Sequence, residues 1–410
     1  MTSLKKNPPI LSVVIPTRNR QKYAISAIIS ILSSISASDF ELVVQDNSDS
    51  RDLEDYIRNK VKDSRLQYNY TSTPLSFIDN FDAGVRLASG KYLCFIGDDD
   101  GVNPEIIEAA RWADSNNIDA LKPTIRVFYL WPDLEVPSIL FTKIPSNGFL
   151  SISPFSGKIT NVNPEIEIRR VVRNGGKYLE TDIPKLYHGI VKREVLNKVY
   201  EKIGTFFGGL SPDVFAAIAV ASFAKNVVSI DYPLTISGTC KLSGAGASMR
   251  GEHVGHLEDA PHFKYRGAYK WAEIIPRFYS VETIWAETTV TALKVLGRDD
   301  LLQDFNLPLL AANCIVAHPE YKSIILHDMY KAFRMTNKSQ LEGTFQFCYS
   351  LLVGPMWRIF KRVINRTRTI LMINREEIIR VSNVKDIVEA TLILSEYLTT
   401  NNKRFIDLVP

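Results

Sequence analysis

The sequence contains few cysteines and almost no excess of one charge. Its four cysteines lie far apart and form no C-x-x-C pair: Cys94, Cys240, Cys314 and Cys348. This spacing argues against a cysteine-based metal site, and free thiols are the expectation. The formal net charge is only +4 over 410 residues, which is too small to indicate nucleic acid as a partner. We therefore expect a globular chain with no nucleic-acid partner.

The beginning of the sequence lacks a long apolar run. Its first apolar segment, in MTSLKKNPPILSVVIP, is interrupted by Pro16 and followed by Arg18 and Arg20. This pattern fits neither a signal peptide nor a membrane-spanning helix. We therefore expect a cytoplasmic protein.

Glycine-rich phosphate-binding loops are also missing. The first β-rich run continues into Pro16-Thr17-Arg18 instead of G-x-G-x-x-G, and G-x-x-x-x-G-K-[ST] does not occur. SGAGASMRG, at residues 243–251, has the wrong spacing and is expected to form a flexible loop. These absences exclude a Rossmann dehydrogenase and a P-loop enzyme. A nucleotide site would instead need acidic residues and a divalent cation that bridges a diphosphate.

Short β-rich runs alternate with helical segments in the first third of the sequence. The β-rich runs are ILSVVIP, ELVVQD, RLQYNY and KYLCFIG, and helical patterns fill residues 21–35, 52–61 and 77–88 between them. This alternation predicts an α/β core with a parallel sheet and helices on both of its faces.

Three polar loops follow strands of this predicted sheet. They are PTRNR at residues 16–20, DNSDS at 46–50 and DDD at 98–100. Ligands of such sheets bind beyond the carboxyl ends of the strands. We therefore expect the three loops to converge on one ligand site.

The triplet Asp98, Asp99 and Asp100 places like charges directly after an apolar run. Their mutual repulsion requires a positive partner, for which a divalent cation or a helix N-terminus is the usual choice. The alternative is a solvated turn that leads into the helix beginning near Asn103-Pro104.

Several motifs, taken together, resemble those of family 2 glycosyltransferases. SVVIPTRNR, ELVVQDNSDS and ASGKYLCFIGDDDGVNPE occur in the order and spacing of that family, over roughly residues 10–240. The resemblance implies the GT-A fold, a Rossmann-like nucleotide-sugar-binding core. It also implies a nucleotide-diphosphate-sugar donor, a Mn²⁺ or Mg²⁺ cofactor, and inversion at the anomeric carbon.

The resemblance assigns roles to residues of the three loops. It places nucleotide contacts at five positions: Pro16, Thr17, Arg18, Asp46 and Asp98. Asp46 would contact the base, and a carboxylate that accepts a pyrimidine imide N–H favours UDP or dTDP. Asp98 would contact the ribose, and Asp99 would bind the metal with help from Asp100. Many family members carry an aspartate where this sequence has Gly97.

An inverting transfer needs a general base for the acceptor hydroxyl. The family places this carboxylate at the start of a helix in the second half of the fold, and the match here is Asp213 in Ser211-Pro212-Asp213. The alternative is that Asp213 only caps its helix.

Two histidines are further candidates. His188 in YHG follows a predicted strand and could contact the acceptor, whereas His253 in GEHVGHLEDAPH could supply a nitrogen ligand to the metal. The alternative for each is a loop histidine without such a role.

The chain divides by pattern into two regions. We expect a GT-A domain at residues 1–250, with a nucleotide-binding half at 1–125 and an acceptor-binding half at 126–250. Residues 251–410 are mainly helical in pattern. This helical region could pack on the core, join two chains in a homo-oligomer, or shape the acceptor channel.

A basic amphipathic pattern covers residues 352–372. Its apolar face carries Met356, Phe360, Val363, Ile364 and Leu371, and its basic face carries Arg358, Lys361, Arg362 and Arg368. Such a helix suits an anionic membrane surface, where it would hold the enzyme on the inner face of the membrane. The alternative is a helix packed on the core.

These observations predict an inverting, metal-dependent glycosyltransferase. It would move a sugar to a hydroxyl of a glycan or lipid-linked acceptor in bacterial-type surface polysaccharide synthesis. Two alternatives are a nucleotidyltransferase, which should carry a glycine in the PTRNR loop, and a non-catalytic nucleotide-sugar-binding scaffold.

Overall fold

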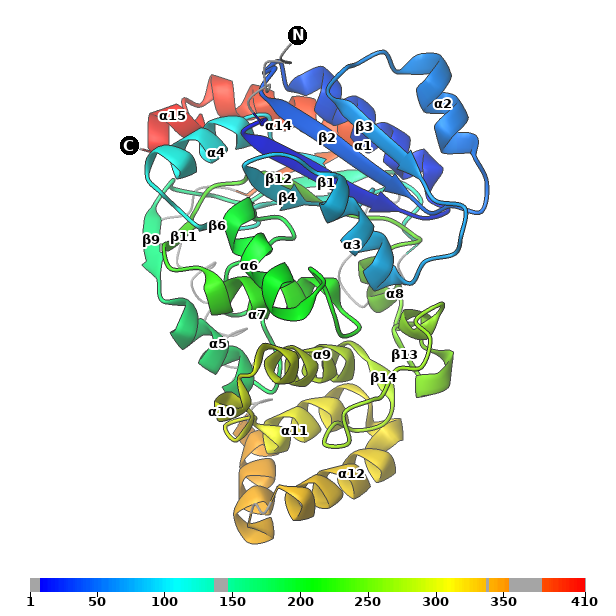
Figure 1. The fold of residues 1–410 in the computed structure, drawn as a ribbon, viewed down its shortest axis with the longest axis vertical. Helices are drawn as coiled ribbons and strands as arrows, with labels where there is room; N and C mark the ends of the chain where they lie inside the picture. The colour runs from blue at the N-terminus through cyan, green and yellow to red at the C-terminus, as the bar shows by residue number, and fades with distance from the viewer. Residues whose placement is uncertain (1–7, 136–146, 337–338, 354–377, 410) are drawn as a thin grey trace.

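The structure is a computed structural model that describes residues 8–135, 147–336, 339–353 and 378–409. An eight-stranded mixed sheet forms its centre (Figure 1). In spatial order its strands are β3 (Leu66–Tyr70), β2 (Phe40–Asp46), β1 (Leu11–Thr17), β4 (Tyr92–Phe95), β10 (Ile190–Lys192), β6 (Ala120–Pro123), β11 (Val227–Ile230) and β9 (Ile159–Val162). The first four strands are parallel, whereas β10 and β9 run antiparallel to their neighbours.

Helices cover both faces of this sheet. One face carries α1 (Gln21–Ser34), α2 (Asp52–Lys60) and α4 (Ile106–Ser115), and the other carries α3 (Phe77–Leu87), α6 (Arg193–Ile203) and α7 (Pro212–Phe223). All seven residues of β1 are buried, as expected for a parallel strand covered on both faces. Successive residues alternate between the faces, so Val13 packs toward α1 and Val14 toward α3. The predicted α/β core is confirmed.

A second sheet adjoins the first at the aspartate triplet. In spatial order its strands are β15 (Ile379–Ser382), β8 (Phe149–Ile152), β7 (Val127–Leu130), β12 (Thr235–Thr239) and β5 (Gly101–Val102). The triplet lies between β4 of the first sheet and β5 of the second. Both sheets therefore fix the ends of this loop.

The region after residue 250 is mainly helical, as predicted. Its described elements are α9 (Val281–Leu296), α10 (Asp299–Leu302), α11 (Leu307–Ala317), α12 (Lys322–Met335), α14 (Ile387–Thr400), α15 (Phe405–Leu408), the helical residues 340–353, and the short strands β13 (Val254–Gly255) and β14 (Tyr279–Ser280). The helices α9, α11 and α12 share a buried apolar cluster with α7 and with α5 (Pro164–Arg173). The prediction of a flexible loop at residues 243–251 is wrong: this segment contains the short helix α8 (Gly244–Met249), which begins where the Ser243 side chain accepts a hydrogen bond from the Gly246 N–H.

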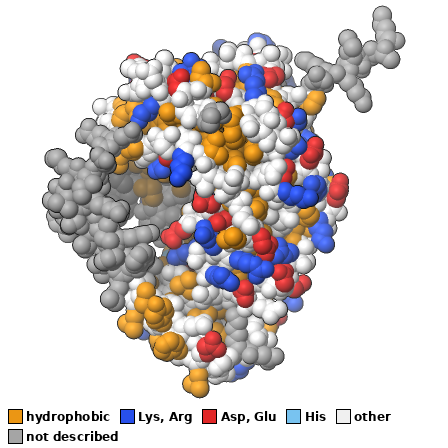
Figure 2. All heavy atoms as spheres, turned by 90° about the vertical axis from the view of Figure 1, so that its left-hand side faces the viewer, with side chains coloured by type: hydrophobic (Ala, Val, Ile, Leu, Met, Phe, Trp, Pro, Cys, Tyr) orange, Lys and Arg blue, Asp and Glu red, His pale blue; other side chains and the backbone are white. Residues whose placement is uncertain are grey.

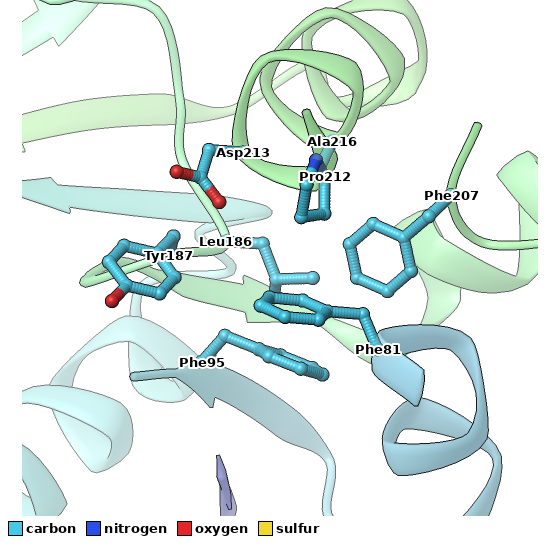
Figure 3. Close-up of a pocket in the computed structure, with 8 residues that line it drawn as sticks. All are labelled: Phe81, Phe95, Leu186, Tyr187, Phe207, Pro212, Asp213 and Ala216. Atoms are coloured by element: carbon cyan, nitrogen blue, oxygen red, sulfur yellow. The ribbon is translucent and has the colours of Figure 1, made fainter. Parts of the chain in front are cut away.

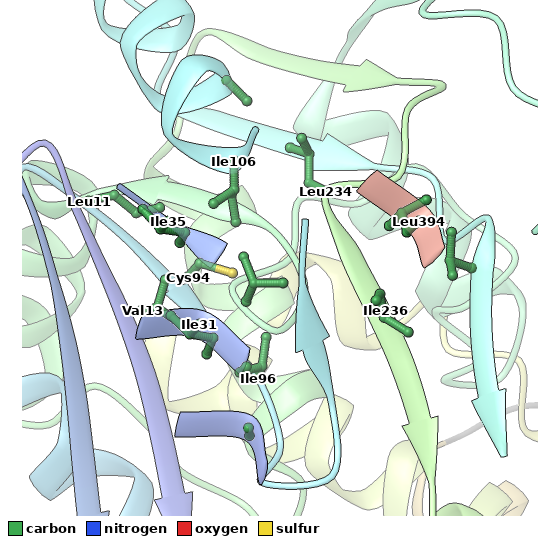
Figure 4. Close-up of a cluster of buried hydrophobic side chains, with 14 of the residues drawn as sticks. Leu11, Val13, Ile31, Ile35, Cys94, Ile96, Ile106, Leu234, Ile236 and Leu394 are labelled. Carbon is green, nitrogen blue, oxygen red and sulfur yellow. The ribbon is translucent and has the colours of Figure 1, made fainter. Parts of the chain in front are cut away.

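The last described segment packs against elements of the first half of the chain. β15 pairs with β8, and α14 lies beside α1 (Figure 1), where Ser30 and Thr391 form a 2.8 Å hydrogen bond. Leu394 of α14 belongs to the same buried cluster as Ile236 of β12 (Figure 4). Residues 378–409 are therefore part of the core that carries the ligand loops.

The surface carries both signs of charge. Figure 2 shows Lys and Arg side chains interspersed with Asp and Glu, with apolar patches in the upper middle and at the lower end of that view. The helical residues 340–353 expose a stripe of large apolar side chains: Leu341, Phe345, Tyr349 and Leu352.

Within the described ranges, no helix combines the length and hydropathy that crossing a bilayer requires. Most of the predicted basic amphipathic segment, residues 354–372, lies outside the described residues.

Replacing Leu394 with alanine tests whether α14 is integral to the core. Leu394 is fully buried, so Leu394→Ala should lower the free energy of unfolding by about 2–5 kcal/mol. Leu392 of the same helix is 61% exposed, and its replacement should cost no more than about 0.5 kcal/mol. Urea unfolding of the two variants measures the difference. Equal, small losses would show that α14 is not part of the core.

Candidate active site

Asp100 anchors the aspartate triplet. Its Oδ1 accepts a hydrogen bond from the Gly238 N–H at 2.7 Å, and its Oδ2 accepts from the Gly97 N–H and the Tyr187 hydroxyl, each at 2.7 Å. The His188 Nε2 lies 3.4 Å from the same Oδ2. Because both oxygens already have partners, Asp100 positions the loop, and its predicted help in metal binding stays a prediction.

The backbone of the triplet packs directly on β12. The Trp131 Nε1–H donates a hydrogen bond to the Asp99 carbonyl oxygen at 2.9 Å. A Cβ atom on Gly238 would lie 1.8 Å from that oxygen, so only glycine allows β12 this close.

Asp98 and Asp99 share one positive partner, the guanidinium of Arg20. Its Nη2 lies 3.0 Å from Asp98 Oδ1 and 2.8 Å from Asp99 Oδ1. The second oxygen of Asp98 accepts from the Thr17 hydroxyl at 2.6 Å, and that of Asp99 accepts from the Cys240 N–H at 3.2 Å. The positive charge predicted at the triplet is therefore supplied by the chain itself.

Arg20 counteracts the cost of burying these carboxylates. The pKa of Asp99 is raised to about 7. Burial is the main cause; Arg20 lowers the pKa, and the charges of Asp100 and Asp98 raise it. Burial likewise raises the pKa of Asp98, and Arg20 and Thr17 lower it. Removing Arg20 without a replacement cation would favour protonation of both groups.

The predicted nucleotide contacts lie together at the ends of β1 and β2. Thr17 is in register with Asp46, and Pro16 with Gln45. Asp46 is fully buried, and its oxygens accept hydrogen bonds from the Ser48 N–H and the Tyr68 hydroxyl, each at 2.8 Å. Since Thr17 also bonds to Asp98, the structure joins the loops after β1, β2 and β4, as predicted.

Arg18 faces away from the triplet. It donates hydrogen bonds to Asn47 Oδ1 at 2.8 Å and to Asp49 Oδ1 at 3.0 Å. Its guanidinium carbon lies 4.7 Å from the centre of the Tyr265 ring.

The segment after residue 250 contacts both the loop after β1 and the turn before α7. Tyr265 contacts Arg18, and Arg266 donates a hydrogen bond to the Gly209 carbonyl at 3.3 Å. Arg266 also lies 3.8 Å from Asp79 at the start of α3. Sequence reasoning missed both residues, because the loop that carries them has no periodic pattern or motif.

Asp213 lies in the first turn of α7 and lines a small pocket. The other lining residues are Phe81, Phe95, Leu186, Tyr187, Phe207, Pro212 and Ala216. Figure 3 shows the carboxylate on the Tyr187 side of this pocket, away from Phe207. Tyr187 donates its hydroxyl hydrogen to Asp100, so one side chain separates Asp213 from the triplet.

The turn before Asp213 is held by contacts from outside its own helix. Ser211, the N-cap residue, makes no side-chain capping hydrogen bond. The N–H groups of Leu210 and Ser211 instead donate to Thr288 Oγ1 of α9, at 3.2 and 3.1 Å. The pKa of Asp213 is raised to about 6. Burial is the main cause; the charge of Lys185 lowers the pKa, and that of Asp100 raises it.

The two histidines occupy different places. His188 is buried behind the triplet, with Nδ1 2.8 Å from Thr235 Oγ1, and burial lowers its pKa. His253 packs against Tyr279 and places Nδ1 3.4 Å from the Gly244 carbonyl oxygen. No hydrogen bond or ion pair in the described structure joins His253 to the triplet. Acceptor contact by His188 and metal contact by His253 stay predictions.

The aspartates offer two oxygens to a divalent ion. Among the described residues, no group of three His, Cys, Asp or Glu side chains forms a ligand set. However, Asp98 Oδ1 and Asp99 Oδ1 face one point, where Arg20 Nη2 lies, and Asp98 Oδ1 is buried without a hydrogen-bond partner. Mg²⁺ prefers oxygen ligands and is usually held by one or two carboxylates together with phosphates and water. The two residues therefore fit such an ion.

Comparison with known proteins identifies the class of this core. Residues 12–168 match the family model "Glycosyl transferase family 2". This match confirms the resemblance of residues 12–168 to the family 2 glycosyltransferases, and the mixed α/β sheet agrees with the GT-A core that the resemblance implies.

Two relatives match a short stretch of the chain. One is a GalNAc(5)-diNAcBac-PP-undecaprenol beta-1,3-glucosyltransferase from Campylobacter jejuni, 37% identical over 97 residues that cover 22% of this chain and 30% of the relative. The other is WcaA of Escherichia coli K12, described as a glycosyl transferase of colanic acid biosynthesis, 32% identical over 101 residues that cover 24% of this chain and 36% of the relative.

A solved structure of S. aureus TarS with UDP-GlcNAc is also similar. It is 18% identical, covers 83% of this chain and 79% of its own, and has a TM-score of 0.42. At this level of likeness nothing about the ligands of the present chain follows from it.

Replacing Gly238 tests the contact between β12 and the triplet. Gly238→Ala should destabilise the protein by at least about 1–3 kcal/mol, because the new methyl group meets backbone that cannot move aside. It should also displace Asp100 and weaken nucleotide binding. Gly255→Ala is the control, since a Cβ there would have its nearest neighbour at 4.0 Å. Thermal unfolding and nucleotide titration measure both effects, and a Gly238→Ala protein equal to the control would contradict the contact.

Proposed function

We propose that this protein is an inverting glycosyltransferase that moves a sugar from a nucleotide-diphosphate sugar to a hydroxyl group of an acceptor. The observation that carries this proposal is the placement of Asp213 across Tyr187 from the aspartate triplet. An inverting transfer needs these two functions close together, namely a donor-diphosphate site and a carboxylate that takes the acceptor proton. The same proposal divides residues 1–250 into a donor half at 1–125 and an acceptor half at 126–250.

The donor nucleotide would bind at the ends of β1 and β2, against Pro16, Thr17, Arg18 and Asp46. Within the protein, each carboxylate oxygen of Asp46 accepts one hydrogen bond, from the Ser48 N–H or the Tyr68 hydroxyl. An ionised carboxylate has about four acceptor positions, so it can still accept an N–H from a base. This chemistry favours the imide of UDP or dTDP.

The diphosphate would lie over Asp98 and Asp99. A divalent ion held by Asp99, with Asp98 beside it, would supply positive charge to the departing diphosphate when bound. Asp100, fixed by Gly238 and Tyr187, holds these two carboxylates in place.

Asp213 would act as the general base. As the acceptor oxygen bonds to the anomeric carbon and the bond to the diphosphate breaks, the hydroxyl proton passes to the Asp213 carboxylate. A pKa near 6 keeps this group mostly ionised at neutral pH while making it a stronger base than an exposed aspartate.

The names of the two relatives support a glycan or lipid-linked acceptor in bacterial-type surface polysaccharide synthesis. Attachment of the enzyme to the inner membrane surface fits such an acceptor. The exposed apolar stripe on residues 340–353, directly before the basic segment, supports this attachment; pairing of two chains through it is the alternative.

Replacing Asp213 with asparagine tests the base. Transfer should fall by roughly 10²–10⁴-fold, the usual contribution of a general base, whereas donor binding should stay near normal. Asp182→Asn is the control, because this carboxylate is exposed and pairs with Lys122. Radiolabelled transfer and calorimetric donor binding provide the two measurements. Full transfer by Asp213→Asn would remove it from the base role, and a wild-type protein that binds donors without any turnover would favour the scaffold.

The pH dependence of transfer provides a second test. Because the base must be ionised, kcat/KM should rise with pH through a midpoint near 6. Lys185 lowers the pKa of Asp213, so Lys185→Met should move this midpoint to higher pH. Lys198→Met removes the same charge from the exposed face of α6 and should leave the midpoint unchanged. A midpoint that stays in place in Lys185→Met would argue against Asp213 as the titrating group.

A further inference from the structure

Arg20 makes an unusual set of contacts for an arginine. A single nitrogen, Nη2, lies 3.0 Å from Asp98 Oδ1, 2.8 Å from Asp99 Oδ1 and 3.1 Å from Cys240 Sγ. That nitrogen carries two hydrogens but faces three acceptors. The Arg20 Nε, in contrast, is buried without a hydrogen-bond partner. The guanidinium therefore acts here as a point charge and does not use its planar fork.

The aspartates are equally imperfect partners for a guanidinium. In a bidentate pair with arginine, one carboxylate accepts two parallel hydrogen bonds from the guanidinium, one on each oxygen. Here Asp98 and Asp99 each present one oxygen, because Thr17 and Cys240 hold the other two. Asp98 Oδ1 forms no well-directed hydrogen bond. Two single oxygens from different residues, directed at one point, suit a small ion better than a planar group.

The triplet nevertheless needs a positive charge in every state of the protein. Asp98, Asp99 and Asp100 are only 2–4% exposed. Removing one partner of a buried ion pair leaves an uncompensated charge that destabilises the protein. Arg20 is 21% exposed and lies directly before α1, so part of its side chain already reaches solvent.

We infer that Arg20 and the divalent ion are alternative occupants of one cation position between Asp98 and Asp99. In the nucleotide-free protein Arg20 fills this position. The ion that arrives with the donor diphosphate displaces the guanidinium toward solvent. This inference rests on the proposed function, because it requires a donor diphosphate that shares its ion with Asp98 and Asp99.

Competition between Arg20 and the ion has a measurable consequence. Metal binding without nucleotide should be weak, because the ion must displace a paired arginine. Arg20→Gln should therefore bind Mn²⁺ at least tenfold more tightly than the wild type when no nucleotide is present. Arg20→Lys keeps the charge and should remain close to the wild type. Electron paramagnetic resonance of free Mn²⁺ measures these affinities directly.

Two further variants control for other effects. Arg51→Gln removes an equal charge beside the loop after β2, where Arg51 pairs with Glu54, and should not change Mn²⁺ affinity. Adding Asp99→Asn to Arg20→Gln should abolish the gain, because the shared oxygen pair is lost. A gain that survives this double replacement would overturn the inference.

Stability supplies a readout if Arg20→Gln folds poorly. In a chelator this variant should unfold at a lower temperature than the wild type, since its aspartates lack a cation. Mn²⁺ should raise its Tm by more than it raises that of the wild type, because an ion that binds only the folded state stabilises it. Equal Mn²⁺ responses in both proteins would overturn the inference.

The result also separates this inference from the proposed function. Equal Mn²⁺ affinities for the wild type and Arg20→Gln, together with Mn²⁺-dependent donor binding, would overturn only the competition. Donor binding that is the same in chelator and in Mn²⁺ would overturn the proposed metal dependence and the competition with it.

Discussion

The burial of three adjacent carboxylates between two sheets is the constraint on which the rest of this site depends. The loop can hold them because β1 and β4 are parallel neighbours, so that Thr17 and Arg20 after β1 reach Asp98 and Asp99 after β4. On the other side, Gly238 of β12 and Cys240 just after it donate their N–H groups, and Gly238 allows the two backbones to approach closely. Each carboxylate thus has a defined set of partners within the protein.

The same loop is linked to the pocket that contains Asp213. Tyr187 donates to Asp100 and also lines that pocket, so its ring connects the triplet with the proposed base. The turn before Asp213 is held by Thr288 of α9, which belongs to the helical region. That region therefore positions the proposed base, while its other end, α14, packs beside α1 and the donor loops. A substitution in α9 or α14 can therefore alter the proposed site without contacting a substrate.

Sequence patterns predicted the strands, because a hydrophobic run is a local signal. They also predicted the convergence of the loops, because the carboxyl ends of parallel strands lie at the same edge of a sheet. Asp98, Asp99 and Asp213 could be proposed from motif order. The partner of the triplet could not, because pairing between side chains of separate loops depends on their directions, and PTRNR offers two arginines. Only the structure shows that Arg18 faces Asn47 and Asp49 whereas Arg20 faces the aspartates. The contribution of Tyr265 and the return of β15 to β8 are long-range contacts without a local signal.

Charge balance is consistent with an arginine at a site that is proposed to accept a metal. Arg20 brings one positive charge to three buried carboxylates. A divalent ion in its place would bring two. A diphosphate brings further negative charge, so the exchange reduces repulsion at the moment when the donor arrives. An ion that binds without a diphosphate would have a smaller favourable binding free energy, because it must displace Arg20, which already offsets the buried negative charge. Under the proposed exchange, this pairing would couple metal binding to donor binding, and Arg20 would offset the buried carboxylates while no donor is bound.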